Sequence, residues 1–233
     1  KKVNLAVVGA TGMVGRTFLK GLKEKNFPID NLYLMASKRS AGTKLEYDGK
    51  EYIVEELTEH SFDKPIDIAL FSAGGSTSEK FAPIAAAHGV IVVDNSAQWR
   101  QHPDVPLVVP EVNPEDISWN HGIIANPNCS TIITAMAVGA LNRLSPIESM
   151  VACTYQAVSG AGQGGLEELE CQMDALARGE KCEAKVFPTQ IALNVIPFIG
   201  SMLDNLYTDE EMKMHVFDQY SIYNLFRQER EID

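Results

Sequence analysis

The chain has 233 residues, of which 45% are hydrophobic and 22% charged, and its formal net charge is −11. This composition is normal for a globular protein of one large or two small domains, and the negative charge argues against nucleic acid or an anionic membrane as partner. No apolar run approaches the roughly 18 residues that a membrane-spanning helix needs. The chain enters a predicted strand at Lys1-Lys2-Val3 with no signal peptide, so we expect a cytoplasmic location.

The cysteine pattern excludes two common roles. The cysteines form no CxxC pair, and no histidine lies near one at metal-ligand spacing. We therefore expect reduced thiols, with neither a disulfide framework nor a zinc site. The cysteines are Cys129, Cys153, Cys171 and Cys182.

The N-terminal stretch has the pattern of a nucleotide-binding unit. Val3 to Val8 is a continuous apolar run, typical of a buried parallel strand. It leads into Gly9-Ala10-Thr11-Gly12-Met13-Val14-Gly15, and a helix follows. In a dinucleotide-binding turn, Gly9 allows the tight turn, Gly12 lets the backbone approach a pyrophosphate, and Gly15 packs the helix on the strand. Because the spacing is G-x-x-G-x-x-G, an ordinary strand–helix corner is the alternative.

The end of the second predicted strand, Asn31 to Ala36, indicates which dinucleotide binds. NAD-binding folds usually place an acidic residue there to hold the ribose 2′-hydroxyl. This chain has Ser37-Lys38-Arg39-Ser40 instead. Two cations and two hydroxyls suit a 2′-phosphate, which favours NADP over NAD. A solvated basic loop is the alternative.

Strands and helices alternate through the first half of the chain, which predicts a parallel, doubly wound sheet. Lys44 to Tyr47 and Glu51 to Val54, joined by Asp48-Gly49, predict a hairpin. Ser72-Ala73-Gly74-Gly75-Ser76-Thr77 is a second turn of small residues, where the backbone can approach a cofactor closely. Further strands are predicted at Ile66 to Phe71, Val90 to Val93, Leu107 to Pro110 and Gly122 to Ala125, and a helix from Ser78 to His88.

Cys129 lies at a predicted strand-to-helix corner. The strand that ends at Ala125 is stopped by Pro127, and a helix is predicted from Ser130 to Leu144. The free N–H groups and the positive end of a helix N-terminus favour an anionic sulfur and can hold a developing oxyanion. Cys129 is therefore a candidate covalent nucleophile. An inert buried cysteine is the alternative.

Arg100 is a candidate binder of an anionic ligand. It lies in the loop Trp99-Arg100-Gln101-His102-Pro103-Asp104 and has no obvious acidic neighbour in sequence. In so acidic a chain, an anion has to be held by local basic groups and amides. A surface ion pair is the alternative.

The pattern changes after the Cys129 helix, which predicts a second, α+β domain. Glu148 to Val158 predicts a long strand, with Gln156 late in it, where a polar side chain can face a ligand. A glycine-rich turn from Ser159 to Gly165 and a charged helix from Leu166 to Arg178 follow. Asp204 to Met214 is helix-like and contains the capping sequence Thr208-Asp209-Glu210-Glu211.

Seven stretches across about residues 3–214 together resemble the aspartate-semialdehyde dehydrogenase family. The cysteine motif and the Tyr-Gln-Ala-Val-Ser-Gly motif are the specific ones. The stretches are Val7-Val8-Gly9-Ala10-Thr11-Gly12-Met13-Val14-Gly15, Ala36-Ser37-x-Arg39-Ser40, Phe71-Ser72-Ala73-Gly74, Val109-Pro110-Glu111-Val112-Asn113, Asn126-Pro127-Asn128-Cys129-Ser130-Thr131, Thr154-Tyr155-Gln156-Ala157-Val158-Ser159-Gly160-Ala161-Gly162 and Asn205 to Met214.

The resemblance implies NADPH-dependent reductive dephosphorylation of aspartyl phosphate to aspartate semialdehyde, on the route to lysine, methionine and threonine. Cys129 would attack the acyl phosphate and release phosphate, and hydride from NADPH would then reduce the thioester. The family usually forms homodimers through its second domain. The resemblance thus implies a small-molecule substrate and a homodimer.

The resemblance also implies roles for individual residues. Gln156 would orient the substrate, Arg100 and Lys213 would bind phosphate, and Glu210 would lie beside the substrate amine. Together with the two turns of small residues, it gives a set of predicted NADP contacts. They are Gly9, Thr11, Gly12, Met13, Val14, Arg39, Ser40, Ser72, Ser159 and Gly160.

The resemblance ends after Met214. The family's chain continues with an Arg for the substrate carboxylate and a His general acid/base in an Arg-x-Pro-Val-x-x-x-His-type strand, and neither motif appears here. A positioned general acid/base contributes about 10²–10⁴ in rate. The alternative to an active enzyme is therefore a truncated, non-catalytic relative that retains NADP binding or subunit contacts. N-acetyl-glutamyl-phosphate reductase, which shares the chemistry, is a more distant alternative.

The predicted organisation has three parts. Residues 1–127 form a Rossmann-type NADP-binding domain with a doubly wound parallel sheet. Residues 128–214 form an incomplete α+β catalytic and dimerisation domain, and residues 215–233 form an unmatched tail.

Overall fold

The computed structural model describes residues 1–147 and 149–212. Within these ranges the chain divides into two compact units, the first over residues 1–147 and the second over residues 149–212. Within the described ranges, every helix is too short or too polar to cross a lipid bilayer.

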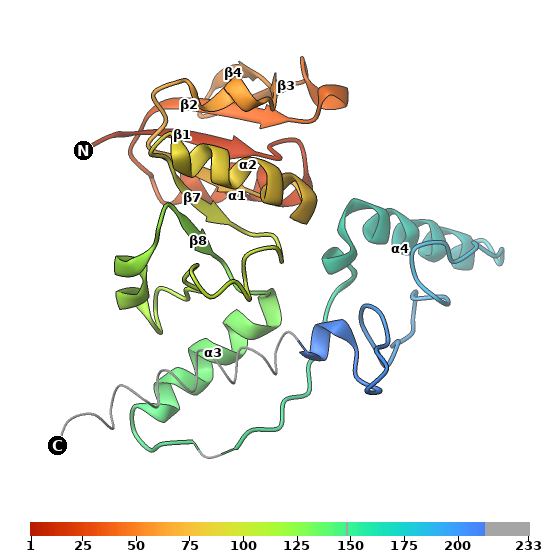
Figure 1. The fold of residues 1–233 in the computed structure, drawn as a ribbon. Coiled ribbons are helices and arrows are strands. Elements are labelled where there is room, and N and C mark those ends of the chain that lie inside the picture. The colour runs from red at the N-terminus through yellow and green to blue at the C-terminus, as the bar shows by residue number, and fades with distance from the viewer. Residues whose placement is uncertain (148, 213–233) are drawn as a thin grey trace. The chain divides into compact units, whose positions relative to one another are not determined.

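The first unit is built on a parallel sheet, which in the described part of the chain has six strands in the order β5-β2-β1-β6-β7-β8. This is the order of the doubly wound nucleotide-binding fold, whose two halves meet between β1 and β6. The predicted fold class is confirmed. The strands are β1 Val3–Val8, β2 Ile29–Ala36, β5 Glu55–Glu56, β6 Ile68–Phe71, β7 Ile91–Asp94 and β8 Ile123–Ala125 (Figure 1). The α-helices are α1 Met13–Glu24, α2 Gly75–Ala87 and α3 Cys129–Asn142.

The two faces of this sheet are covered by different helices. Successive side chains of β1 point to opposite faces, as in any strand. Leu5 and Val7 belong to a buried cluster that includes Leu19 of α1. Ala6 and Val8 belong to a separate buried cluster that includes residues of α2. The continuous apolar run of β1 is thus explained by burial on both faces.

The predicted hairpin forms as a separate two-stranded sheet. Strands β3, Lys44–Tyr47, and β4, Lys50–Ile53, pair in an antiparallel register. Asp48 and Gly49 join them with φ values of 50° and 74°. Positive φ at both central residues is the mark of the tight hairpin turn that Asp-Gly favours.

The strand predicted from Leu107 to Pro110 is wrong. Leu107 makes an isolated parallel bridge with Ala125, and the chain then turns away. The side chain of Asn113 replaces a sheet partner, because its Oδ1 accepts from Val109 N at 2.8 Å and its Nδ2 donates to Leu107 O at 3.0 Å. A side chain that satisfies the backbone groups removes the need for a strand neighbour.

Two helices begin about one turn earlier than predicted. Helix α2 starts at Gly75 instead of Ser78, and the charged helix of the second unit, α4, covers Gly162–Ala177 instead of starting at Leu166. Glycine is penalised in the middle of a helix but is common near its N-terminus. The glycine turns therefore form the first turns of the helices themselves.

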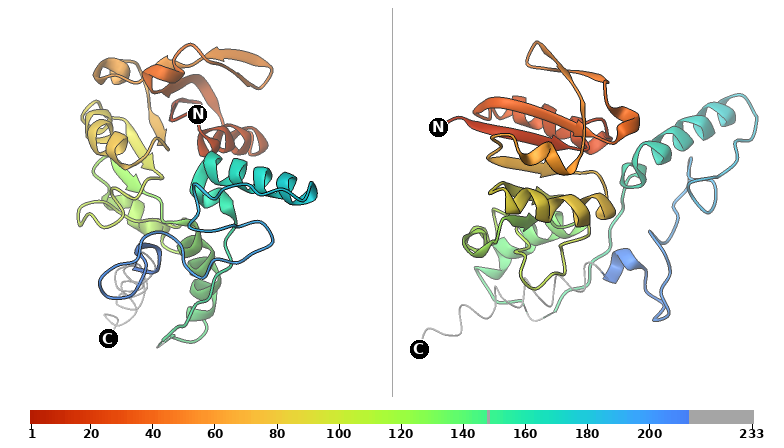
Figure 2. Two further views of the ribbon diagram at one scale, coloured as in Figure 1. Left: turned by 90° about the vertical axis from the view of Figure 1, so that its right-hand side faces the viewer. Right: turned by 45° about the horizontal axis from the view of Figure 1, so that its top comes forward.

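In the second unit the long strand predicted from Glu148 to Val158 is wrong for the residues that the structure describes. Residues 149–157 run as irregular chain into a short 3₁₀ helix, η4 Val158–Ala161, which precedes α4 (Figure 2). Glu148 lies outside the described residues. A strand needs a neighbour for its N–H and C=O groups, and no pairing involves this segment in the described part of the chain.

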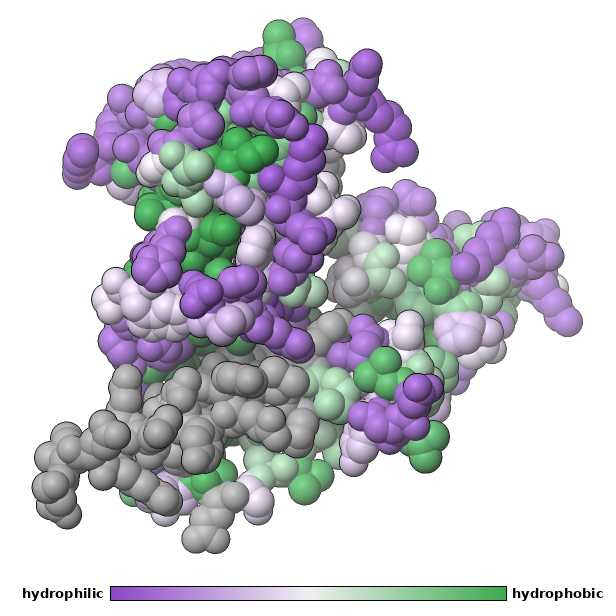
Figure 3. Space-filling view, in the orientation of Figure 1, coloured by the Kyte–Doolittle hydropathy of each residue, from purple (hydrophilic) through white to green (hydrophobic). Residues whose placement is uncertain are grey.

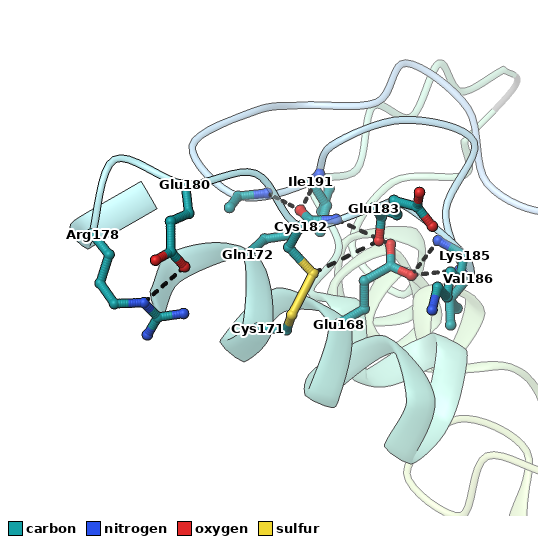
Figure 4. Close-up of a disulfide and its surroundings, with 11 residues drawn as sticks. Glu168, Cys171, Gln172, Arg178, Glu180, Cys182, Glu183, Lys185, Val186 and Ile191 are labelled. Atoms are coloured by element: carbon teal, nitrogen blue, oxygen red, sulfur yellow. Dashed lines mark hydrogen bonds and ion pairs between the residues drawn. A yellow bond between two sulfur atoms is a disulfide. The ribbon is translucent and has the colours of Figure 1, made fainter. Parts of the chain in front are cut away.

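The prediction of reduced thiols throughout is wrong at two positions, because Cys171 and Cys182 form a disulfide (Figure 4). Their Cα atoms are 6.4 Å apart and 11 residues separate them. Helix α4 ends at Ala177, and Gly179, with φ of 72°, reverses the chain. This return brings Cys182 beside Cys171, and a spacing along the sequence does not reveal it.

Two side chains of α4 hold the returning segment, residues 185–192, against the helix (Figure 4). The carboxylate of Glu168 accepts from the backbone N–H groups of Lys185 at 2.7 Å, Val186 at 2.5 Å and Phe187 at 3.3 Å. The side-chain oxygen of Gln172 accepts from the N–H groups of Ile191 at 2.9 Å and Ala192 at 3.0 Å. Burial alone would raise the pKa of Glu168, but these donors together hold it below its ordinary value of 4.5.

The lowered pKa of Glu168 predicts an acid-sensitive attachment of this segment. A carboxyl group whose pKa is lower in the folded state stabilises above its unfolded pKa, here about 4.5, and that stabilisation is lost as pH falls through the folded value. We expect Glu168→Gln to reduce the hydrogen-exchange protection of the Lys185, Val186 and Phe187 amides roughly tenfold at pH 7. The difference from the unmodified chain should close toward pH 3.

The matched control is Glu167→Gln, which changes the neighbouring exposed carboxylate that accepts from Gln163. It should leave the three amides unaffected at every pH. A protection difference for Glu168→Gln that stays constant from pH 7 to pH 3 would show that the carboxylate charge has no part in holding the segment.

The described second unit exposes large apolar side chains. The face turned to the viewer in Figure 3 mixes hydrophobic with polar residues over this unit. Leu193 is 85% exposed and Leu206 is 84% exposed, whereas its buried apolar residues among those described are Ala175 and Ala192. A unit with so little apolar burial gains stability when another surface covers it.

Candidate active site

The two turns of small residues meet at the carboxyl edge of the sheet. Strands β1 and β6 run in register with Val8 opposite Phe71, so Gly9 and Ser72 follow side by side. Gly9 has φ of 86°, and a Cβ atom there would lie 2.2 Å from the backbone oxygen of Ser72. Only glycine fits this close approach. It lies at the point where the two halves of the sheet meet, which is where such folds bind nucleotides.

The turn after β1 fits a dinucleotide. Helix α1 begins there with Gly12 as its N-cap, which supplies no capping side chain, and helix N-termini of this kind bind phosphate groups. A Cβ at Gly15 would lie 2.2 Å from Gly9 O, so glycine also permits the close packing of the helix on the turn. Thr11 and Met13 are half-buried and Val14 is 38% exposed. Val14, a predicted NADP contact, is thus open to solvent beside the turn.

The basic turn after β2 lies at the same edge. Val8, the last residue of β1, pairs with Met35 of β2. The turn Ser37–Ser40 therefore begins beside the glycine turn, one residue further along in the strand direction. Its residues Lys38–Ser40 form a 3₁₀ turn, η1. Arg39 is exposed and Ser40 is half-buried. A guanidinium and a hydroxyl beside a dinucleotide-binding turn suit a 2′-phosphate.

Cys129 is exposed and is the first residue of α3. The alternative of an inert buried cysteine therefore does not hold. Asn128 is the N-cap, and its Oδ1 accepts from Thr131 N at 3.0 Å. Asp94 of β7 pairs with Ala125 of β8, so the corner that carries Cys129 follows β8 at the same edge of the sheet as the glycine turn.

Arg100 lies at this edge and contacts the backbone there. Its side chain is half-buried. The Nε atom donates to Asn126 O at 2.9 Å and Nη2 donates to Asn95 O at 2.9 Å. The guanidinium thus bridges the ends of β7 and β8, beside the segment that leads to Cys129.

The remaining predicted site residues belong to the second unit. Gln156 is exposed, and its Oε1 accepts from Thr154 Oγ1 at 3.0 Å. Ser159 and Gly160 are exposed in η4. Glu210 is half-buried in the first turn of the last described helix, whose predicted capping box is confirmed. In it Thr208 Oγ1 and N donate to the carboxylate of Glu211 and Glu211 N donates to Thr208 Oγ1. Lys213 lies outside the described residues.

A polar cluster that was not predicted lies at the segment that leads to the candidate nucleophile. Asp94 is fully buried, and Asn126 Nδ2 donates to Asn95 Oδ1 at 2.8 Å. The sequence did contain a signal for this cluster, because Asp94 and Asn95 directly follow the predicted buried strand. Polar residues in such a place rarely lack hydrogen-bond partners. What the sequence does not show is that the partners come from the neighbouring strand.

Known proteins share both units. The model of the semialdehyde dehydrogenase NAD-binding domain matches residues 4–120, and that of the semialdehyde dehydrogenase dimerisation domain matches residues 138–224. The aspartate-semialdehyde dehydrogenase of Aquifex aeolicus is 54% identical over 213 residues, which cover 90% of this chain. The chain belongs to the aspartate-semialdehyde dehydrogenase family. The resemblance seen in the motifs is confirmed.

Solved structures agree with this membership of the aspartate-semialdehyde dehydrogenase family. The crystal structure of aspartate semialdehyde dehydrogenase II of Vibrio cholerae complexed with ASA has a TM-score of 0.92 at 47% identity, over 96% of this chain and 67% of that one. The enzyme of Candida albicans with NADP has a TM-score of 0.56 at 27% identity, over 63% of this chain and 48% of that one. The chain spans 63% of the length of the Aquifex relative.

Proposed function

We propose that this chain performs the aspartate-semialdehyde dehydrogenase reaction, the NADPH-dependent conversion of aspartyl phosphate to aspartate semialdehyde and phosphate. The observation that carries the proposal is the exposed Cys129 at the N-terminus of α3, on the same sheet edge as the glycine turn. The identities of the relatives support it. The reaction draws on water-soluble metabolites, which supports a cytoplasmic location.

The chemistry divides into two steps at Cys129. Its thiolate attacks the carbonyl carbon of the acyl phosphate. An S–C bond forms, the bond between that carbon and the bridging oxygen breaks, and the oxygen leaves as part of the phosphate. NADPH, when bound, supplies the hydride that reduces the resulting thioester. The C–S bond then breaks, and the aldehyde and the Cys129 thiolate are released. Splitting one difficult step into two easier ones is the advantage of a covalent nucleophile.

The other residues bind and orient in this proposal. Arg100, a guanidinium fixed at the sheet edge, and Lys213 bind the phosphate group. Gln156 orients the carbonyl, and Glu210 binds the substrate amine. The predicted NADP contacts Thr11, Met13, Val14, Ser159 and Gly160 complete the site with the glycine and basic turns.

A homodimer is part of the proposal. The dimerisation-domain model matches residues 138–224, and the second unit exposes large apolar side chains such as Leu193 and Leu206. Burial of such side chains against a second copy stabilises both. Sedimentation of the full chain should then report a mass twice that of one chain.

The test of the proposed function is phosphate-dependent reduction of NADP by aspartate semialdehyde, followed at 340 nm. Turnover that needs both phosphate and the semialdehyde would establish the activity. NADP binding without turnover would favour the alternative, a non-catalytic relative that retains the nucleotide site. The absence of both NADP binding and turnover would refute the proposed function and the non-catalytic alternative together.

Replacement of Arg39 by alanine should weaken the binding of NADP but leave the binding of NAD nearly unchanged. A charge-assisted hydrogen bond contributes about 1.5–3 kcal/mol, so NADP affinity should fall roughly 10- to 100-fold while NAD affinity stays within about twofold. Titration of NADPH and NADH fluorescence measures both. Lys44→Ala, an exposed cation paired with Glu51 at 2.8 Å, is the control. Equal losses for the two cofactors would contradict a 2′-phosphate contact.

A further inference from the structure

The Arg100 side chain joins two loops that leave the sheet at neighbouring positions. Its Nε and Nη2 atoms donate to the backbone oxygens of Asn126 and Asn95, each at 2.9 Å. A guanidinium is planar, so two donors on two separate carbonyls fix both its position and its plane. The orientation of Arg100 therefore depends on what holds those two carbonyls.

The two asparagines hold each other. Asn126 Nδ2 donates to Asn95 Oδ1 at 2.8 Å across the ends of β8 and β7. Their backbones are also attached to the sheet, since Asn95 N donates to Phe71 O at 2.9 Å and Asn126 N donates to Asp94 O at 2.8 Å. Asn126 precedes Pro127, which restricts its backbone to extended conformations. The peptide oxygens that Arg100 contacts thus have little freedom to turn.

A buried carboxylate anchors the loop on its other side. Asp94 is fully buried and accepts from Ser78 Oγ at 2.7 Å and Ser96 Oγ at 2.6 Å. The indole of Trp99, the residue before Arg100, donates to Ser78 Oγ at 2.9 Å. A buried charge is costly unless it is hydrogen-bonded, so these bonds also fix the loop that carries Arg100.

From this network we infer that Asn95 and Asn126 are positioning residues, whose mutual hydrogen bond sets the guanidinium of Arg100 to receive a substrate phosphate beside Cys129. The inference rests on the proposed function and assigns it two further residues. Cys129 follows Asn126 by three residues on the same corner. The pair acts through Arg100, and truncating either member should weaken phosphate binding without altering access to the Cys129 sulfur.

The experiment measures how inorganic phosphate protects Cys129 from alkylation by iodoacetamide, in the full chain carrying Cys153→Ser. Asn126→Ala and Asn95→Ala are each expected to raise the phosphate concentration for half-protection about tenfold. Their alkylation rate without phosphate should stay within about twofold of the parent. The double variant should be no worse than either single one, because both remove the same hydrogen bond.

Two controls separate positioning from general support of the fold. Asn120→Ala removes an asparagine that donates to Ile117 O away from this edge, and it should leave half-protection unchanged. Arg100→Ala should raise the phosphate concentration for half-protection at least as far as the asparagine variants do. Arg100→Lys should not return that concentration to the parent value.

Unchanged half-protection in both asparagine variants, with Arg100→Ala impaired, would overturn the inference and leave the proposed function standing. The inference would also be overturned if the alkylation rate without phosphate changed by as large a factor as the half-protection concentration. Asn95 and Asn126 would then have only a structural role. A parent chain that phosphate fails to protect, with Arg100→Ala no different, would overturn the phosphate site of the proposed function and this inference together.

Discussion

Cys129→Ala is expected to abolish phosphate-dependent NADP reduction by aspartate semialdehyde, with a loss on the order of 10⁴-fold or more in kcat. Cys129 is exposed and begins α3, and both steps of the proposed chemistry need its sulfur, which forms the thioester in the first step and is released from it in the second. The neighbouring Ser130 cannot replace it, because that residue is buried and has a weakly nucleophilic hydroxyl. Initial rates at saturating phosphate, read at 340 nm, provide the measurement.

The fold should survive this change, because the corner is held by other residues. Asn128 caps the helix through Thr131 N, so NADP affinity and thermal unfolding should match the parent. Cys153→Ser, which changes the other exposed cysteine outside the disulfide, is the matched control and should keep full activity. A Cys129→Ala chain that retains more than about one per cent of the rate would rule out covalent catalysis at this position.

The strongest sequence signals were those of buried parallel strands and glycine turns. The run Val3–Val8 is confirmed as β1 to the residue, because burial on both faces demands an unbroken apolar sequence. The Asp48-Gly49 turn is confirmed for a comparable reason, since positive φ at two successive positions is accessible to few residue pairs. Such features are local and leave their mark on the residues that form them.

The failed predictions share one cause, which is that partners outside the segment decide its structure. Residues 149–157 have strand-like composition, but a strand exists only with a neighbour. Leu107–Pro110 lost its strand to one side chain, that of Asn113. The disulfide between Cys171 and Cys182 depends on how the chain returns after α4.

The residue types of the candidate site were predictable from the sequence, but the hydrogen bonds that hold those residues in place were not. Cysteine at a helix start, cations after the second strand and glycines after the first are residue types that their chemistry requires. The parallel order of the sheet then collects those of the first unit at one edge, as the carboxyl ends of parallel strands always do. The hydrogen bond from Asn126 to Asn95, however, joins residues 31 positions apart in the sequence. The type and position of either asparagine alone do not predict it.

Gly9→Ala is expected to destabilise the first unit by about 2–5 kcal/mol and to abolish NADP binding. A positive φ, here 86°, disfavours alanine by roughly 1–2 kcal/mol, and forcing an extra carbon into a packed interior adds about 1–3 kcal/mol. The added Cβ would lie 2.2 Å from Ser72 O and 2.7 Å from Ser72 C, both backbone atoms of the neighbouring turn. The turns that line the nucleotide site would therefore be forced apart.

Gly42→Ala isolates the clash from the backbone strain, because Gly42 has nearly the same φ, 85°, with no atom within 4 Å of the added Cβ. Urea unfolding should show a loss of roughly 1–2 kcal/mol there, with NADP affinity unchanged. The excess loss in Gly9→Ala then measures the cost of separating the glycine turn from Ser72. Equal destabilisation in the two variants would mean that the turns can move apart at little cost, and the requirement for glycine at this crossing would be conformational alone.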